Sequence, residues 1–196
     1  MEYKLLIIHG FNSSPQSYKA QLTIEYMAKK FPNVEVFCPQ LKSTPIDAVE
    51  QLEQIIKNAP NAKWRVTGSS LGGFFATYLA SKYDIKAVLI NPAVKPYELL
   101  EDVIGEQTNP YTNEVYMVTY EHMQQLQSFD ITEFETARFM VMVQTGDEVL
   151  DYKQATEKYK DCHLIVQSGG DHSFINFDDM LNDIVKFLEL ENNAKY

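Results

Sequence analysis

Short apolar runs alternate with longer segments of helical periodicity along most of the chain. The runs have the length of strands, at residues 3–9, 34–37, 63–67, 85–90, 139–145 and 164–167, and the first of them is apolar at nearly every position. This pattern is typical of strands that are buried on both faces, as in a parallel sheet. Apolar residues at helical spacing predict helices at about residues 17–30, 44–58, 73–80, 153–160 and 177–190. Residues 192–196 are expected to fray.

Strands that alternate with helices predict an α/β fold, in which helices cover both faces of a mostly parallel sheet. Right-handed crossovers leave few topologies, and we predict six strands in the order 2-1-3-4-5-6. This order places strands 1 and 3 side by side, where the direction of winding reverses. Ligands of open α/β sheets bind at this point, outside the carboxyl ends of the strands.

Residues 92–135 interrupt the alternation of strands and helices. They are rich in tyrosine, methionine and phenylalanine, and their pattern predicts helices at 97–104 and 120–129 with a turn at Asn109-Pro110. The insertion follows strand 4 at the expected ligand-binding edge. It either forms a small lid over an acyl pocket or packs its large side chains onto the body of the protein. We expect residues 1–196 to form one domain that carries this insertion.

The sequence Gly68-Ser69-Ser70-Leu71-Gly72 lies where the third predicted strand turns into a helix. A Gly-x-Ser-x-Gly motif in this context is typical of a nucleophile elbow, the sharp turn that exposes a reactive serine. The amino end of the following helix favours negative charge beside that serine. Because the motif also occurs by chance, Ser70 needs a base, an acid and an oxyanion site to qualify as a nucleophile.

The best candidate for the base is His172, in the loop after the last strand. Gly169-Gly170 precede it and permit a tight loop that brings the imidazole over the neighbouring serine. The remaining histidines, His9, His122 and His163, are expected to be structural. His9 is better placed to support the loop after strand 1 than to reach Ser70.

The acid that orients His172 is expected in the loop after strand 5. Asp147 lies nearest the end of that strand and is the favoured candidate. Asp151, four residues further on, has the position of a helix cap, and Glu148 is expected to point to solvent. The resulting order of Ser70, Asp147 and His172 along the chain is that of an α/β hydrolase, so we predict a three-layer α/β-hydrolase fold.

An oxyanion hole needs two backbone donors that point at the developing negative charge. We expect one donor to be the N–H of Leu71, directly after the nucleophile. The other should come from the His9-Gly10-Phe11 loop, as the N–H of Phe11. Chemistry of this kind needs no metal and no organic cofactor.

The composition sets limits on the partners and the compartment. The net charge of −10 argues against nucleic acid, which a negatively charged surface repels, and against an anionic membrane. No apolar run approaches the roughly 20 residues of a membrane span, and the first residues do not resemble a signal peptide. Cys38 and Cys162 show no metal-binding spacing and are expected to be free thiols. A cytoplasmic protein is therefore expected.

Several segments together resemble the YqiA-type esterases of γ-proteobacteria, small members of the α/β-hydrolase superfamily. The resemblance implies carboxylic-ester hydrolysis with Ser70, Asp147 and His172 as the triad. Where the family carries an asparagine before the histidine, this chain has Asp171, which is another candidate acid. The matching segments are His9 to Pro15, Gly68 to Gly73, Asn91 to Val94 with Pro96, Thr145 to Tyr152, and Gly170 to Phe174.

These observations favour a serine esterase or thioesterase that acts on small acyl esters through an acyl-enzyme. An acyltransferase is the enzymatic alternative, in which an alcohol or amine replaces water. A hydrolase-fold binding protein without turnover is the non-enzymatic alternative. The sequence predicts a small-molecule substrate; the acyl length, the leaving group and the oligomeric state stay open.

Overall fold

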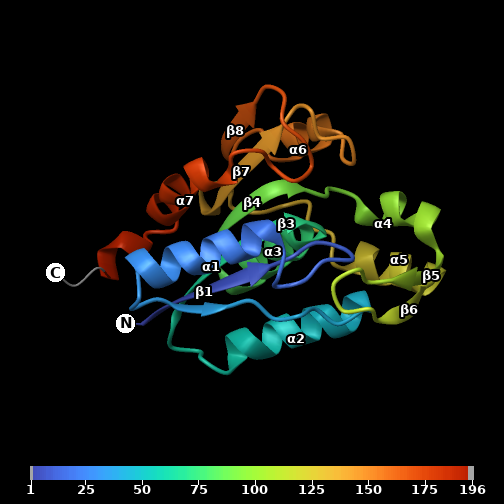
Figure 1. The fold of residues 1–196 in the computed structure, drawn as a ribbon, viewed down its shortest axis with the longest axis horizontal. Helices are drawn as coiled ribbons and strands as arrows, with labels where there is room; N and C mark the ends of the chain where they lie inside the picture. The colour runs from blue at the N-terminus through green and yellow to red at the C-terminus, as the bar shows by residue number, and fades with distance from the viewer. Residues whose placement is uncertain (1, 194–196) are drawn as a thin grey trace.

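A six-stranded sheet runs through the centre of the computed structural model, which describes residues 2–193 (Figure 1). All neighbouring strands of this sheet are parallel, and their order is β2-β1-β3-β4-β7-β8. The predicted order is confirmed; the numbers differ only because the insertion contributes two further strands. The six strands are β1 (Tyr3–Ile8), β2 (Glu35–Phe37), β3 (Lys63–Ser70), β4 (Lys86–Pro92), β7 (Phe139–Gln144) and β8 (His163–Gln167).

Helices cover both faces of the sheet, as predicted. Successive side chains of a strand point to opposite faces, and in β1 Leu5 and Ile7 pack into one core while Leu6 and Ile8 pack into the other. The first core includes side chains of two helices, α1 (Tyr18–Lys30) and α7 (Leu181–Phe187). The second core includes side chains of three helices, α2 (Pro45–Lys57), α3 (Leu71–Tyr83) and α6 (Tyr152–Lys158).

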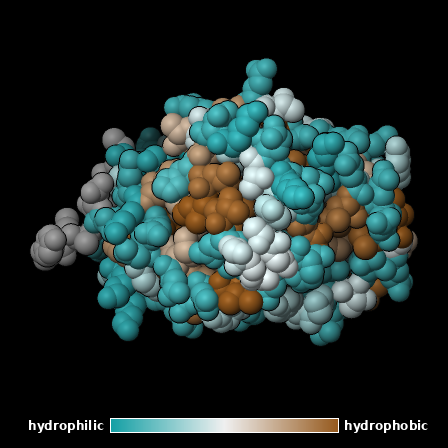
Figure 2. All heavy atoms as spheres, turned by 90° about the horizontal axis from the view of Figure 1, so that it is seen from above, coloured by the Kyte–Doolittle hydropathy of each residue, from teal (hydrophilic) through white to brown (hydrophobic). Residues whose placement is uncertain are grey.

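The insertion forms one end of the molecule. Figure 1 shows the start of β1 on the left and the insertion on the right. Figure 2 shows a mainly hydrophilic face that is interrupted by separate hydrophobic patches. Within residues 2–193, no helix has both the length and the apolar character needed to cross a bilayer.

The insertion contains a hairpin that the sequence pattern did not predict. The predicted helix at 97–104 is a single turn, α4 (Pro96–Leu99), followed by the 3₁₀ segment η1 (Leu100–Val103). An antiparallel pair then follows, β5 (Gly105–Thr108) with β6 (Val115–Val118). Each strand has only four residues, too few to show an alternating pattern. The predicted second helix is present as α5 (Tyr120–Ser128), and η2 (Thr136–Arg138) leads into β7.

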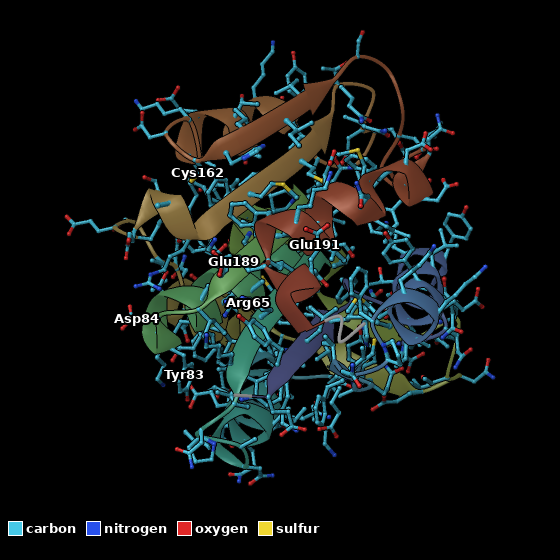
Figure 3. All side chains as sticks on the ribbon, turned by 90° about the vertical axis from the view of Figure 1, so that its left-hand side faces the viewer. Arg65, Tyr83, Asp84, Cys162, Glu189 and Glu191 are labelled. Atoms are coloured by element: carbon cyan, nitrogen blue, oxygen red, sulfur yellow. The ribbon has the colours of Figure 1, made fainter. Side chains whose placement is uncertain are left out.

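The predicted C-terminal helix over 177–190 is divided into three pieces. These are η3 (Phe177–Met180), α7 and η4 (Leu190–Asn193). Glu189 ends the helical path because its φ is 59°, outside the right-handed helical region. Its carboxylate pairs with Arg65 of β3 and Lys86 of β4, and Figure 3 shows Arg65 and Glu189 next to each other. Of the tail expected to fray, residues 194–196 lie outside the described residues.

Candidate active site

Ser70 is the last residue of β3 and occupies a strained turn that leads directly into α3. Its φ and ψ are 55° and −123°, a conformation that costs a non-glycine residue about 1–3 kcal/mol. The surrounding structure must therefore hold it in place. The strand–turn–helix context predicted for the Gly68–Gly72 motif is present.

The two glycines of the motif are required by close backbone contacts. A Cβ atom on Gly68 would lie 2.2 Å from the carbonyl oxygen of Gly72. A Cβ atom on Gly72 would lie 2.2 Å from the carbonyl oxygen of Ile8 in β1. The first turn of α3 therefore packs directly against the end of β1, which brings the loop after β1 to Ser70. A Cβ atom on Gly10 of that loop would lie 3.6 Å from Ser70 Oγ.

The structure brings Asp147 and His172 together. His172 Nδ1 lies 3.0 Å from Oδ1 and 2.9 Å from Oδ2 of Asp147, whose side chain is only 2% exposed. Burial raises the pKa of Asp147, but hydrogen bonds from His172 and from the amides of Leu150 and Val149 outweigh this effect. The pKa therefore lies below its ordinary value, and the carboxylate is charged.

The other acidic side chains near His172 have different partners. Asp151 caps α6 by accepting a hydrogen bond from the Lys153 amide, as its position suggested. Asp171 accepts from the hydroxyl of the nearby Ser173. Glu148 was expected to point to solvent; its side chain is exposed, yet Oε2 accepts from the His172 amide at 3.0 Å. Among these carboxylates, Asp147 is the partner of the imidazole.

Ser70 and His172 are linked through the end of β4. The Ser70 carbonyl accepts from the Ala93 amide at 3.0 Å. Asn91 Nδ2 donates to the carbonyls of Asp171 and His172, at 3.1 and 3.3 Å. Within residues 2–193, no hydrogen bond joins the Ser70 hydroxyl to the His172 ring; in free enzymes, catalytic hydrogen bonds are often long and tighten on binding.

Gln144, the last residue of β7, holds the His172 loop in place and was missed in the sequence. Its Oε1 accepts from the amides of Asp171 and Ile175, and its Nε2 donates to the Ile175 carbonyl. Its own amide donates to Asn91 Oδ1 at 2.9 Å. Gln144 and Asn91 are both buried. The signal that identifies them is a polar residue at the carboxyl end of an otherwise apolar strand.

Lys19 of α1 also contacts this loop and was not identified from the sequence. Its Nζ donates to the Ser173 carbonyl at 3.0 Å. Burial lowers its pKa, while the charges of Asp171 and Asp147 act in the opposite direction. Lys19 therefore contributes positive charge on the side of the loop that faces α1.

His9 supports the loop after β1, as predicted. It is 4% exposed, and its Nε2 accepts from the Leu41 amide at 3.1 Å. Nδ1 must then carry the proton, and it donates to the Gly10 carbonyl at 3.0 Å. His9 thereby joins the end of β1 to the segment between β2 and α2.

Leu71 and Phe11, the predicted oxyanion donors, line one common pocket with Gly10. As the first residue of α3, Leu71 has an amide without an acceptor inside the helix. His122 lines the same pocket, and its Nδ1 accepts from the Thr119 amide at the start of α5. His163 is exposed at the start of β8. Residues 2–193 contain no group of three or more histidine, cysteine or acidic residues that could hold a metal ion.

A family model matches most of the chain. It is described as an uncharacterised protein family, UPF0227, and it covers residues 4–189. The UPF0227 protein YcfP of Escherichia coli O9:H4 (strain HS) is 22% identical over 188 residues, covering 95% of this chain and 99% of that protein. YcfP of Salmonella arizonae is 23% identical over the same coverage. The resemblance noted from the sequence is confirmed at the level of the family.

Solved structures with the same fold span nearly the whole chain. Est1E from Butyrivibrio proteoclasticus has a TM-score of 0.73 and 17% identity, over 98% of this chain and 89% of that one. A putative hydrolase from Agrobacterium vitis S4 has a TM-score of 0.70 and 18% identity, over 95% and 88%. Mouse α/β hydrolase domain-containing protein 10 has a TM-score of 0.69 and 17% identity, over 98% and 90%. The predicted α/β-hydrolase fold is confirmed.

Proposed function

The chain belongs to the UPF0227 family, and we propose that it is a serine hydrolase that cleaves carboxylic esters or thioesters of small acyl groups. The observation that carries the proposal is the buried, charged Asp147 carboxylate, with both oxygens within 3.0 Å of His172 Nδ1. It lies at the same edge of the sheet as the strained turn at Ser70. The hydrolases among the structural neighbours support this reaction class by analogy.

Each residue has a defined part in the proposed reaction. Because Asp147 engages Nδ1, Nε2 is the nitrogen of His172 that is left to take the proton of Ser70. Ser70 Oγ bonds to the acyl carbon, and the amides of Leu71 and Phe11 stabilise the resulting oxyanion. When the bond to the leaving alcohol or thiol breaks, His172 returns its proton to that group.

Water completes the proposed reaction. His172 takes a proton from water, the hydroxide oxygen bonds to the acyl carbon, and the bond to Ser70 Oγ breaks as Ser70 regains its proton. The products are a carboxylic acid and the alcohol or thiol. No metal or organic cofactor takes part in any step of this route.

The proposal is tested with a fluorophosphonate probe and with p-nitrophenyl butanoate. We expect the probe to label the folded protein at Ser70, and Ser70→Ala to abolish both labelling and turnover. Ser69→Ala is the matched control, because it removes the neighbouring hydroxyl and leaves the nucleophile intact. Folded protein that is neither labelled nor active would refute the proposal. So would equal activity in the wild type and in Ser70→Ala.

A further inference from the structure

A narrow pocket lies next to the turn at Ser70, on one side of the sheet's carboxyl edge. Gly10, Phe11 and Leu71 are among its lining residues, and it provides about 60 Å³ of free space. A Cβ atom on Gly10 would lie 3.2 Å from the Cβ atom of Ser70, so the loop after β1 passes close to this turn. The loops after β1 and β2, helix α2 and the insertion form the other walls.

The order of the strands indicates which part of an ester, the acyl group or the leaving group, lies on the side of this pocket. Strands β1 and β2 lie on one side of β3, whereas β4, β7 and β8 lie on the other. His172 and Asp147 follow β8 and β7, so the imidazole approaches Ser70 from the second side. The leaving group takes its proton from His172 and must lie near it. The acyl group then points to the first side, where the pocket lies.

The inner wall of the pocket is apolar, and several of its side chains are almost inaccessible to solvent. Its free space of about 60 Å³ is small, which favours a short chain over a long one. Polar side chains also line the pocket: His9 and Asn109 are buried, whereas Lys42 and Glu114 are exposed. The apolar side chains of the wall are Leu71, Phe75, Leu100, Val118, Met123 and Leu126.

Hydrogen bonds hold the insertion over the pocket. Tyr116 of β6 donates to Asn12 Oδ1 at 2.7 Å, and Asn109 Nδ2 donates to the Ser13 carbonyl at 3.0 Å. Both acceptors belong to the loop after β1. On the far side, Ser43 Oγ donates to Glu114 at 2.7 Å. The pocket is therefore bounded on the insertion side.

We infer that this pocket binds the acyl chain of the substrate and selects short, unbranched aliphatic chains. The inference rests on the proposed ester hydrolysis, because that reaction defines which side of Ser70 the acyl group takes. Shorter chains leave apolar surface unfilled, and longer chains meet the buried side chains of α5 and α3.

The first test is the dependence of kcat/KM on acyl length, measured with p-nitrophenyl esters from acetate to decanoate. We expect a maximum at butanoate or hexanoate and a loss of at least about tenfold by decanoate, since one extra methylene in a filled pocket costs about 10-fold or more. A rate that keeps rising to decanoate would overturn the inference. A protein that neither hydrolyses any ester nor reacts with the fluorophosphonate would instead overturn the proposed function, and this inference with it.

Two substitutions change the size of the pocket in opposite directions. Met123→Ala should raise the decanoate-to-butanoate ratio of kcat/KM by about tenfold. Ala48→Leu, on the α2 wall, should shift the maximum to acetate. Met27→Ala is the matched control, because Met27 is equally buried but lies in the core on the other face of the sheet. An unchanged profile in a folded pocket variant, or an equal shift in Met27→Ala, would contradict the inference. If Met123→Ala does not fold, the wild-type profile and Ala48→Leu decide.

Discussion

The carboxylates around His172 show how a single residue acquires its role from its hydrogen bonds. Asp147 Oδ1 accepts from the amides of Val149 and Leu150 at 2.9 and 2.8 Å, which fixes the carboxylate in the turn after β7. Asp151 and Asp171 are occupied by a helix cap and by a nearby serine. The sequence could place an acid in this loop and favour Asp147. It could not exclude Asp171, because the path of the loop after β8 decides which carboxylate faces the ring.

Replacing Asp147 by asparagine should lower kcat by about 10⁴-fold, because an amide can donate to Nδ1 and favour the wrong tautomer of His172. The measurement is steady-state hydrolysis of p-nitrophenyl butanoate. Asp151→Asn is the matched control: asparagine also caps helices well, so both kcat and stability should stay close to those of the wild type. A larger loss of kcat in Asp151→Asn than in Asp147→Asn would transfer the role of the acid to Asp151.

At the scale of elements, the ends of β4 and β7 hold the loop that carries His172. The loop itself uses Gly169 and Gly170 at φ of 77° and 74°, as the pair of glycines predicted. Its path is fixed by the side chain of Gln144, which makes hydrogen bonds with both Asp171 and Ile175. Such contacts join residues 27 to 31 positions apart, so no local pattern in the sequence indicates them.

Gln144→Met should disturb this loop while keeping the shape of the side chain. It leaves the Asp171 and Ile175 groups without partners, at about 1–3 kcal/mol for each buried polar group left unpaired. Urea unfolding should show the loss of stability. We also expect kcat to fall in the absence of urea, where the variant is fully folded. Unfolding cannot explain that loss, which would come from a mispositioned His172. Its KM should change little.

Gln54→Met is the control for this prediction. Gln54 lies on the exposed face of α2, and its side-chain amide donates to Asn58 Oδ1, one turn away. The substitution should leave both kcat and stability nearly unchanged. If Gln144→Met kept the wild-type kcat, Gln144 would stabilise the fold without positioning His172.

The central elements were predicted well because their patterns are strong, whereas the insertion was not. Strands β1, β4 and β7 are nearly continuous apolar runs, which is the pattern expected of strands that are buried on both faces. The β5–β6 hairpin pairs strands of four residues, and side chains such as Val115 and Met117 remain exposed. Its position depends on hydrogen bonds to Asn12 and Ser13, about a hundred residues earlier in the chain. The wall of the acyl pocket was therefore beyond what local patterns predict.

At the scale of the whole molecule, the strand order places two sets of loops on opposite sides of Ser70. The loops after β7 and β8 carry the proposed acid and base, whereas the loops after β1 and β2 carry a proposed oxyanion donor and line the pocket. His9 connects the loop after β1 to the loop after β2, because it hydrogen-bonds to Gly10 in the first loop and to Leu41 in the second. Protonation of this buried imidazole would therefore strain both loops and the fold as a whole.

Stability should decrease as the pH falls from 7.5 to 5.5, because burial lowers the pKa of His9 in the folded state. In the unfolded chain a histidine takes up a proton near pH 6.5. Between these two pKa values the unfolded state binds more protons, so the free energy of unfolding falls with decreasing pH, by at most about 1.4 kcal/mol per pH unit. Urea unfolding at both pH values measures this. His9→Gln should flatten the dependence, whereas His163→Gln, at an exposed position, should follow the wild type. An equal slope in His9→Gln and the wild type would show that His9 does not couple protonation to folding.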